Sequence, residues 1–340
     1  GNIMEQEYTG KEDMRQENTG MSASKAYSRT GAALFVMGAL TSAVQILLSY
    51  LSGEFAARGY WFAYSGWYTW VVTFVPLYLV GMPVCVWIMR KVPEQKPNAV
   101  KFGGKEFYVF FLMCLPLMYG GNIIGNVLSM LFSGGQAQNG LLDYAFDTSL
   151  LKVLVMVILA PLLEEFVFRK QIIDRCGKYG EKPAILFSAL TFGLFHMNLF
   201  QFFYAFGLGL VFAYVYTRTR RLRYPVIMHM IINFMGAVIA PSLLTLLDME
   251  ALMRMSEGVV DETAMLSVLP GLAMIMLYFF LLLGLSIAGI VLICLRASRL
   301  VFLPAAYEIP KGRRFRSVYC NAGVVLFVLF CVVMIVLTLV

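Results

Sequence analysis

Charged residues are scarce in this sequence of 340 residues. Asp, Glu, Lys and Arg together make up 14% of it, whereas 60% is hydrophobic and the mean hydropathy is +0.75. Soluble domains usually carry about 25% charged and about 45–50% apolar residues. A soluble fold of this length could not bury so much apolar surface, so we expect much of the chain to face lipid.

The sequence also lacks the alternation of apolar and polar residues, in segments of about ten, that is typical of membrane β-barrels. Its apolar residues instead run continuously for about twenty positions, the length of a membrane-spanning helix. We place nine spans near 31–51, 66–89, 107–133, 150–168, 184–199, 202–217, 224–247, 268–295 and 318–340. The predicted fold is therefore all-α: a polytopic membrane helix bundle of eight or nine transmembrane helices.

Several familiar motifs are missing. There is no HExxH pair of zinc-binding histidines, no GxSxG nucleophile turn and no phosphate-binding Walker loop. The six cysteines include no CxxC pair, which favours small core residues over disulfides or a metal site. The net charge of +7 is not accompanied by a zinc knuckle or an RNP motif, so nucleic acid is not an expected partner.

The basic residues are unevenly distributed between the loops. If residues 1–30 are cytoplasmic and every span reverses direction, 24 of the 27 lysines and arginines lie on the cytoplasmic side. Only Arg58, Lys152 and Arg254 fall on the other side, which collects acidic residues. Because positively charged loops stay on the cytoplasmic side of a membrane, this distribution predicts a cytoplasmic N-terminus.

The chain divides into a tail and a membrane domain. Residues 1–30 are polar and predict a flexible cytoplasmic tail. Residues 31–340 are predicted to form one integral membrane domain, with a catalytic core at about 150–247. Gly120, Gly121 and Gly125 favour close packing of the third span against another helix.

Ionisable residues at membrane depth are costly and usually mark function. His196 and His229 are the only histidines in the sequence, and both lie in apolar spans. At a rise of about 1.5 Å per residue, both histidines lie in the cytoplasmic half of the membrane. The acidic pair at the cytoplasmic end of the fourth span lies in the same half. The predicted catalytic residues are Glu164, Glu165 and Arg169 in the fourth span, His196 in the fifth, and His229 and Asn233 in the seventh.

Helical spacing suggests roles for these side chains. Glu165 and Arg169 are four residues apart and can form an ion pair on one helix face, whereas Glu164 points about 100° away and is free to face a cavity. A carboxylate beside a histidine can take a proton from water and so activate it to attack a carbonyl. His229 and Asn233, also four apart, can offer hydrogen-bond donors to an oxyanion.

In these three motifs the sequence resembles the CAAX-protease and bacteriocin-processing family (CPBP, or Abi), which includes the type II CAAX prenyl endopeptidases. The motifs are Glu164-Glu165-x-x-x-Arg169, Phe192-x-x-x-His196 and His229-x-x-x-Asn233. The resemblance, which covers about residues 150–240, implies an α-helical intramembrane glutamic endopeptidase. It also implies that Glu164 and His196 activate water, with His229 and Asn233 near the oxyanion.

Other functions remain open at this point. Two histidines and a glutamate also match the ligand set of a catalytic zinc ion, so a zinc-dependent intramembrane protease is the alternative to the metal-free mechanism that we favour. A non-catalytic membrane scaffold or bacteriocin-immunity protein could keep the same motifs, and a transporter could use them to relay protons.

The expected partners are membrane lipid and a peptide or lipidated protein substrate. Short basic loops favour a bacterial cell membrane, with the site facing the cytoplasm. The sequence does not indicate an oligomeric state.

Overall fold

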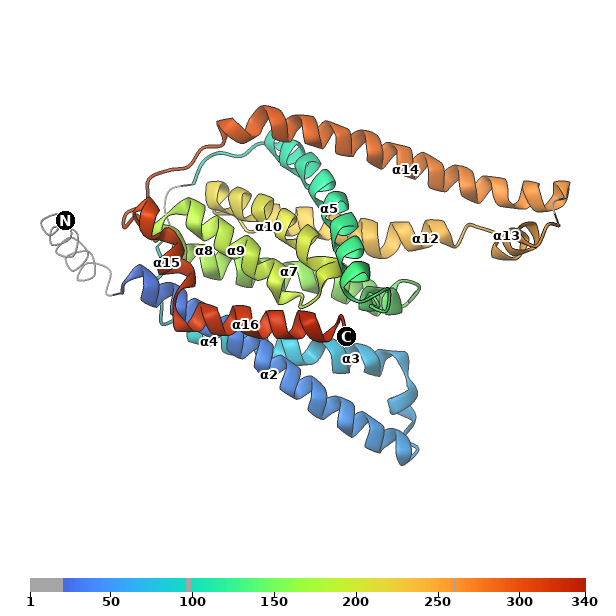
Figure 1. Ribbon diagram of the computed structural model, residues 1–340, viewed down its shortest axis with the longest axis horizontal. Coiled ribbons are helices and arrows are strands. Elements are labelled where there is room, and N and C mark those ends of the chain that lie inside the picture. The colour runs from blue at the N-terminus through green and yellow to red at the C-terminus, as the bar shows by residue number, and fades with distance from the viewer. Residues whose placement is uncertain (1–20, 96–98, 260) are drawn as a thin grey trace, which may run out of the picture.

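The computed structural model describes residues 21–95, 99–259 and 261–340, and helices are the only regular structure in these ranges (Figure 1). This confirms the predicted all-α class. The α-helices are α2 (Ala23–Ala57), α3 (Gly66–Val75), α4 (Met82–Met89), α5 (Gly104–Phe132), α6 (Leu150–Lys152), α7 (Ala160–Glu165), α8 (Ile172–Cys176), α9 (Glu181–Phe195), α10 (Leu199–Thr219), α11 (Arg223–Phe234), α12 (Ala240–Leu244), α13 (Met249–Ser256), α14 (Glu262–Arg296), α15 (Arg314–Tyr319) and α16 (Ala322–Leu337).

Shorter helical turns of other types connect these helices. The π-helical segments are η2 (Pro76–Gly81), η4 (Val153–Leu159), η5 (Phe166–Gln171) and η7 (Met235–Ile239). The 3₁₀ turns are η1 (Trp61–Tyr64), η3 (Gly140–Tyr144), η6 (Gly177–Tyr179), η8 (Ala297–Arg299) and η9 (Lys311–Arg313).

Prolines account for most of the π-helical turns. Pro83 follows η2, Pro161 follows η4 and Pro241 follows η7. Proline has no N–H to donate and its ring crowds the carbonyl four residues earlier, so a regular α-helix cannot continue through it unchanged. A locally wider turn accommodates this defect without ending the helix.

The helix α2 begins inside the segment predicted as a tail. The side chain of Ser22 accepts a hydrogen bond from the backbone nitrogen of Lys25 (3.3 Å), as expected of an N-cap. Ala26, Tyr27 and Thr30 in the first turns are buried. The helix therefore starts where the chain first meets the bundle rather than where its charges end. Residues 1–20 of the predicted tail lie outside the described residues.

Among the described residues, six helices are long and apolar enough to cross a membrane, or seven if the bent pair Lys311–Tyr319 and Ala322–Leu337 counts as one span. The protein is thus an integral membrane protein. The predicted spans at 150–168 and 184–199 are not in this set. The first contains several charged residues and the second corresponds to α9, which has only 15 residues. A count of eight or nine and a cytoplasmic N-terminus stay predictions.

The centre of the bundle is α10, which packs against α5 and α9. Two of the predicted packing glycines lie at its contact with α5. A Cβ atom on Gly121 would lie 2.5 Å from the backbone nitrogen of Tyr204, and one on Gly125 would lie 2.4 Å from the carbonyl oxygen of Leu199. Both positions therefore require glycine, as predicted, whereas Gly120 faces open space.

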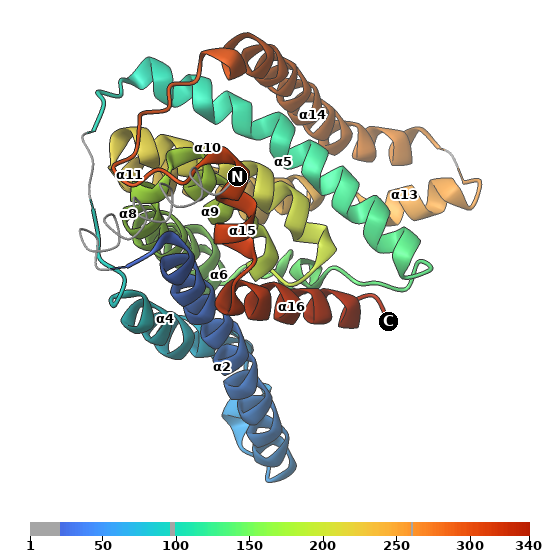
Figure 2. The same cartoon turned by 60° about the vertical axis from the view of Figure 1, so that its left-hand side comes forward.

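The two ends of the described chain lie side by side, because α16 runs along α2 in both views (Figures 1 and 2). Their backbones touch at Gly323, where a Cβ atom would lie 1.7 Å from the carbonyl oxygen of Ser28. On another side α2 packs against η2 and α4. These contacts place the first and last apolar helices on the flank of the core that contains α9.

Four segments meet at one end of the bundle, which we call the basic end. It comprises residues 90–95, 174–181, 218–223 and 296–313, and it lies at the left in Figure 1. Backbone nitrogens of these loops donate across it, from Gln95 to the Asp174 carbonyl (2.8 Å) and from Tyr307 to the Lys178 carbonyl (2.8 Å). The basic loops therefore gather on one side, as the predicted topology requires.

Candidate active site

Four helical segments bring the predicted catalytic residues together. Glu164 and Glu165 are the last residues of α7, and Arg169 follows in η5. His196 caps the C-terminus of α9, and His229 and Asn233 lie in α11. Because α7 packs against α11 while η5 packs against α9 and α10, the three motifs converge inside the protein.

Glu165 is the centre of the cluster. Its carboxylate accepts two hydrogen bonds from Arg169, from Nε to Oε2 (2.7 Å) and from Nη2 to Oε1 (3.3 Å). Oε1 also lies 2.9 Å from Nδ1 of His229. The side chains of Glu165 and Arg169 are completely buried. The ion pair predicted from their spacing is therefore present, and it extends to a second helix.

The guanidinium of Arg169 is held by protein groups on several sides. Its Nη1 donates to the hydroxyl of Ser188 (2.9 Å), which in turn donates to the carbonyl of Phe168 (2.6 Å). The guanidinium also lies over the ring of Phe192, 4.4 Å from its centroid, where the ring face attracts a cation. The arrangement fixes the position of Glu165 rather than exposing a charge.

The geometry determines which nitrogen of His229 carries a proton. A carboxylate paired with arginine can only accept hydrogen bonds, so Nδ1 of His229 donates to Glu165. The ring is held from one side by Phe212, with centroids 5.4 Å apart and planes 27° apart. Its other nitrogen, Nε2, faces Glu164 at 3.7 Å from Oε2. This distance is longer than a hydrogen bond.

Glu164 differs from its neighbour in having no cationic partner of its own. It is buried, with 8% of the residue exposed, and Arg169 bonds to Glu165 instead. Of the two histidines, His229 is the one that lies within ion-pairing distance of Glu164. Two adjacent carboxylates thus occupy different surroundings.

His196 joins the cluster through an aromatic ring. Its Nδ1 lies 2.8 Å from the carbonyl oxygen of Phe192, and since a carbonyl only accepts, Nδ1 carries the proton and Nε2 a lone pair. The ring of Phe192 lies between the two histidines, with its centroid 4.9 Å from His196 and 5.9 Å from His229. Phe192 therefore contacts residues of all three motifs.

A sharp turn immediately follows His196. Met197 adopts a positive φ of 57°, which is uncommon for a residue with a side chain. The side chain of Asn198 holds this turn: its Nδ2 donates to the carbonyl of His196 (2.8 Å), and its Oδ1 accepts from the backbone nitrogen of Gln201 (2.9 Å). Asn198 thereby caps α10 and anchors the backbone of His196.

The structure places Asn233 apart from this hydrogen-bond network. Its Nδ2 donates to the carbonyl oxygen of Met156 in η4 (2.8 Å), so it connects α11 to the helix that leads to the glutamates. It shares a face of α11 with His229, as its spacing predicts. The other N–H of its amide and its carbonyl oxygen make no hydrogen bond within the described residues.

Sequence spacing did not identify several residues that shape the site. Phe192 belongs to the second motif but was not assigned a role, and Phe212, Ser188 and Asn198 were not singled out. The signal for Asn198 was available, because an asparagine three residues before Gln201 at a helix start is a typical N-cap. The other contacts join different helices and have no sequence pattern.

The arrangement also bears on metal binding. Among the described residues, no three His, Cys, Asp or Glu side chains are placed to hold a metal ion together. Glu165 is already bonded to Arg169, and Nδ1 of both histidines is used within the protein. Zinc-binding histidines commonly donate their second ring N–H within the protein in the same way, and Nε2 of both histidines and the Glu164 carboxylate make no hydrogen bond within the described residues. The zinc alternative is therefore a question for the chelator experiment below.

Comparison with known proteins points to one family. The family model described as Rce1-like type II CAAX prenyl endopeptidase matches residues 146–235. Over 108 residues the chain is 37% identical to the membrane-embedded CAAX protease MroQ of Staphylococcus aureus (strain USA300). Residues 146–235 of this chain are therefore similar to the CAAX protease family.

The extent of the match defines the CAAX protease region of the chain. The similarity to the staphylococcal protease covers 29% of this chain and 41% of the relative, so the chain spans less than half of that protein's length. Residues 146–235 include every side chain of the cluster described above, from Glu164 to Asn233. The helices α2 and α14 lie outside the matched region. No solved structure matches the chain.

Proposed function

We propose that this protein is an intramembrane endopeptidase that hydrolyses peptide bonds of membrane-associated or lipidated peptides. The observation that carries the proposal is the asymmetry of the two adjacent glutamates. Glu165 is saturated by Arg169 and His229, whereas Glu164 faces His229 without a hydrogen bond to it. A pair of carboxylates in different surroundings is a recurring feature of acid–base catalysis, because only one of them is free to exchange protons.

In this proposal Glu164 is the general base. Its carboxylate takes a proton from a water molecule as the water oxygen attacks the carbonyl carbon of the substrate. The π electrons of the carbonyl move to its oxygen and form an oxyanion. Glu164 then returns the proton to the amide nitrogen as the C–N bond breaks, which releases a carboxylic acid and an amine.

The histidines assist at different steps. Nε2 of His196 has a lone pair, which can accept a hydrogen bond from the attacking water and orient it. His229 is held by Glu165 and Phe212 and lies beside Glu164, where a protonated Nε2 would stabilise the oxyanion. The remaining N–H of Asn233 is a second donor for the oxyanion. Arg169 and Glu165 act by positioning His229.

The resemblance in the motifs supports a glutamate-dependent, metal-free mechanism in a bacterial cell membrane. The basic loops support a site that opens towards the cytoplasm. A lipidated or apolar peptide is the expected substrate class, since the surrounding helices are exposed to lipid. The scaffold or immunity hypothesis predicts no hydrolysis at all, and the zinc hypothesis predicts hydrolysis that a chelator removes.

The test is cleavage of a quenched fluorescent lipopeptide library by the purified chain in detergent. We expect Glu164→Gln to lower the rate by about 10²–10⁴, the usual contribution of a general base, without changing the melting temperature. Glu106→Gln, on the exposed first turn of α5, is the matched control and should cleave like wild type.

Each outcome separates the hypotheses. Wild-type cleavage that persists in Glu164→Gln would contradict the proposed base. Loss of wild-type cleavage in a strong zinc chelator, restored by zinc, would favour the metal mechanism. No cleavage by folded wild-type protein across the library would favour the non-catalytic scaffold.

A further inference from the structure

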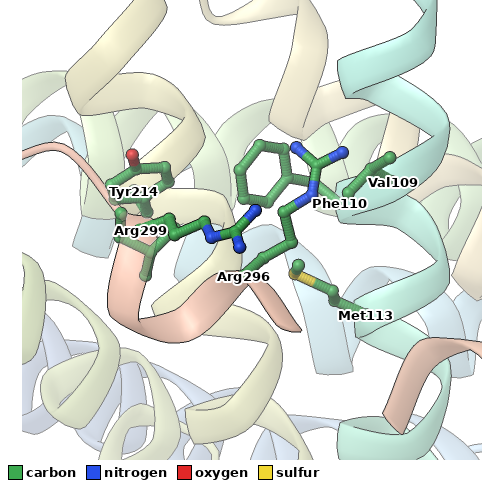
Figure 3. A pocket seen from close by; sticks show the side chains of 7 residues that line it. Val109, Phe110, Met113, Tyr214, Arg296 and Arg299 are labelled. Atoms are coloured by element: carbon green, nitrogen blue, oxygen red, sulfur yellow. The ribbon is translucent and has the colours of Figure 1, made fainter. Parts of the chain in front are cut away.

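A cavity of about 240 Å³ opens at the basic end of the bundle, away from the glutamate cluster. It lies between α5, α10 and the end of α14, as Figure 3 shows. Arg296 and Arg299 line it from α14 and η8, and Tyr214 lines it from α10. The side chains of Phe110 and Met113 from α5 form an apolar wall.

The cavity carries positive charge that the protein does not neutralise. Arg296 and Arg299 make no ion pair or hydrogen bond within the described residues, and no acidic side chain lines the cavity. Some other arginines of the basic end have acidic partners. Arg218 is paired with Glu181, and Arg220 is paired with Asp174. Two guanidinium groups on one concave surface form a ready site for an anion with several acceptor oxygens.

The position of the cavity follows from how α14 meets α5. The two helices touch at Gly289, where a Cβ atom would lie 2.1 Å from the carbonyl oxygen of Leu112. Arg296 lies seven residues further along α14, which is about 10 Å at 1.5 Å per residue. The cavity therefore lies beyond the tight contact of α5 with α14, where α5 provides apolar side chains and the end of α14 provides a cationic rim.

One end of the cavity is rigid. The hydroxyl of Tyr214 accepts a hydrogen bond from the backbone nitrogen of Val301 (3.0 Å), which ties the loop after η8 to α10. The ring of Tyr214 packs against Phe110, with centroids 5.4 Å apart. The favourable effect of arginine at a helix C-terminus explains basic residues at the end of α14 but not a cavity between three helices.

We propose that this cavity binds the phosphate group of an anionic phospholipid. The phosphate oxygens lie between Arg296 and Arg299, and the acyl chains extend along the seam of α5 and α14. The ligand chemistry follows from the two parts of the site: a cationic rim selects a phosphate, and a continuous apolar wall selects an amphiphile over a water-soluble ion. Basic pockets between transmembrane helices bind anionic headgroups for the same reason. This inference is independent of the proposed proteolysis.

The test is lipid retention by the full chain, measured by native mass spectrometry after purification in detergent and titration with phosphatidylglycerol or phosphatidylcholine. Wild type should retain at least one phosphatidylglycerol with a preference of tenfold or more over phosphatidylcholine. Arg296→Gln/Arg299→Gln should lose this preference. Arg90→Gln/Arg316→Gln removes two exposed charges that do not line the cavity and should keep it.

Further arms distinguish the source of the phosphate. Inorganic phosphate and glycerol 3-phosphate, added at the same concentration as the lipid, should not displace it. Displacement by either would show that the site binds a soluble phosphate, and this result would overturn the lipid assignment. An equal loss in the control variant, or no preference in wild type, would overturn the site itself. The single variants Arg296→Gln and Arg299→Gln serve if the double variant has a lowered melting temperature.

Discussion

The helices α10 and α14 are both long and apolar, yet the protein uses them in opposite ways. The mean hydropathy of the most apolar window of α14 is 2.6, and only 6% of that window is buried in the protein. The corresponding values for α10 are 1.6 and 61%. The more hydrophobic helix is therefore the one that the protein covers least. In a membrane protein, high hydropathy reports contact with lipid, whereas a buried helix can include smaller and more polar residues.

This difference explains where the chemistry lies. The glutamates and histidines are carried by segments that pack around α10, and two of those segments are too charged or too short to resemble independent spans. Protein neighbours satisfy polar groups that lipid could not, because hydrocarbon offers no hydrogen bonds. The α14 side of the molecule has no comparable cluster within the described residues.

The largest expected effect is on the buried ion pair. Arg169→Met leaves the carboxylate of Glu165 buried without its partner, which should lower the free energy of unfolding by roughly 3–5 kcal/mol and abolish activity. The same substitution in the other region, Arg296→Met, should leave the unfolding midpoint in detergent and the activity unchanged. Reversible denaturation in mixed micelles would measure both. An equal loss in the two variants would show that the regions do not differ as described.

A smaller effect is expected at the helix contacts. Gly121→Ala and Gly289→Ala both place a methyl group against backbone atoms of the neighbouring helix, and each should cost about 1–3 kcal/mol of stability. Gly121→Ala should also reduce activity, because the crowded helix is α10, which carries the Phe212 ring that stacks on His229. Gly289→Ala, at the contact with α14, should not change the rate per folded molecule.

Matched glycines in the same helices provide the control. Gly120 and Gly284 have open space around the position of a Cβ atom. Alanine at either should be neutral or stabilise the protein by up to about 1 kcal/mol, because it favours the helix more than glycine does. Melting temperatures of the four variants would measure the contrast, and destabilisation by Gly120→Ala or Gly284→Ala would contradict the packing.

The smallest expected effect concerns two N-caps. The side chains of Asn198 and Asp261 cap α10 and α14, with Asp261 Oδ1 accepting from the backbone nitrogen of Ala264 (2.6 Å). Substitution by alanine should cost about 1 kcal/mol at either position. Only Asn198→Ala should lower the cleavage rate, because Asn198 also holds the carbonyl of His196.

Asn198→Asp separates the two roles of this residue. It keeps an oxygen for the cap but loses the donor to His196, so stability should return while the rate stays low. Cleavage rates and melting temperatures of the three variants would measure this, and full activity of Asn198→Ala would contradict the positioning role.

Sequence spacing predicted which residues of one helix share a face. The pairing of Glu165 with Arg169 and the packing of Gly121 follow from which face of a helix a residue occupies, and both are confirmed. The contact of Glu165 with His229, the stacking of Phe212 and the bond from Asn233 to Met156 join different helices. Helical periodicity gives a residue's direction but not how the neighbouring helix is rotated, so these contacts could not be predicted.

The predicted number of spans is not confirmed, for a related physical reason. A hydropathy pattern assumes that every crossing helix meets lipid, whereas α9 is largely buried among α8, α10 and α16. The boundary between the fifth and sixth predicted spans also differs, since α9 ends at Phe195 and α10 starts at Leu199. Met197, whose positive φ ends the helix beside His196, has no sequence signal of its own.

The π-helical segment η4 determines where the chain can lose a residue ahead of the catalytic glutamates. Its wide turn holds one residue more than a regular α-helix would need, and each residue turns a helix by about 100°. Loss of that extra residue between Val153 and Leu159 would close the wide turn into a regular α-helix and keep α7 in place, whereas loss of a residue from α7 itself would rotate the glutamates out of the site. The seven positions of η4 contain only aliphatic residues and methionine, so they can be exchanged among apolar types. A functional homologue can therefore differ by one residue in η4 but should keep the spacing of Glu164, Glu165 and Arg169.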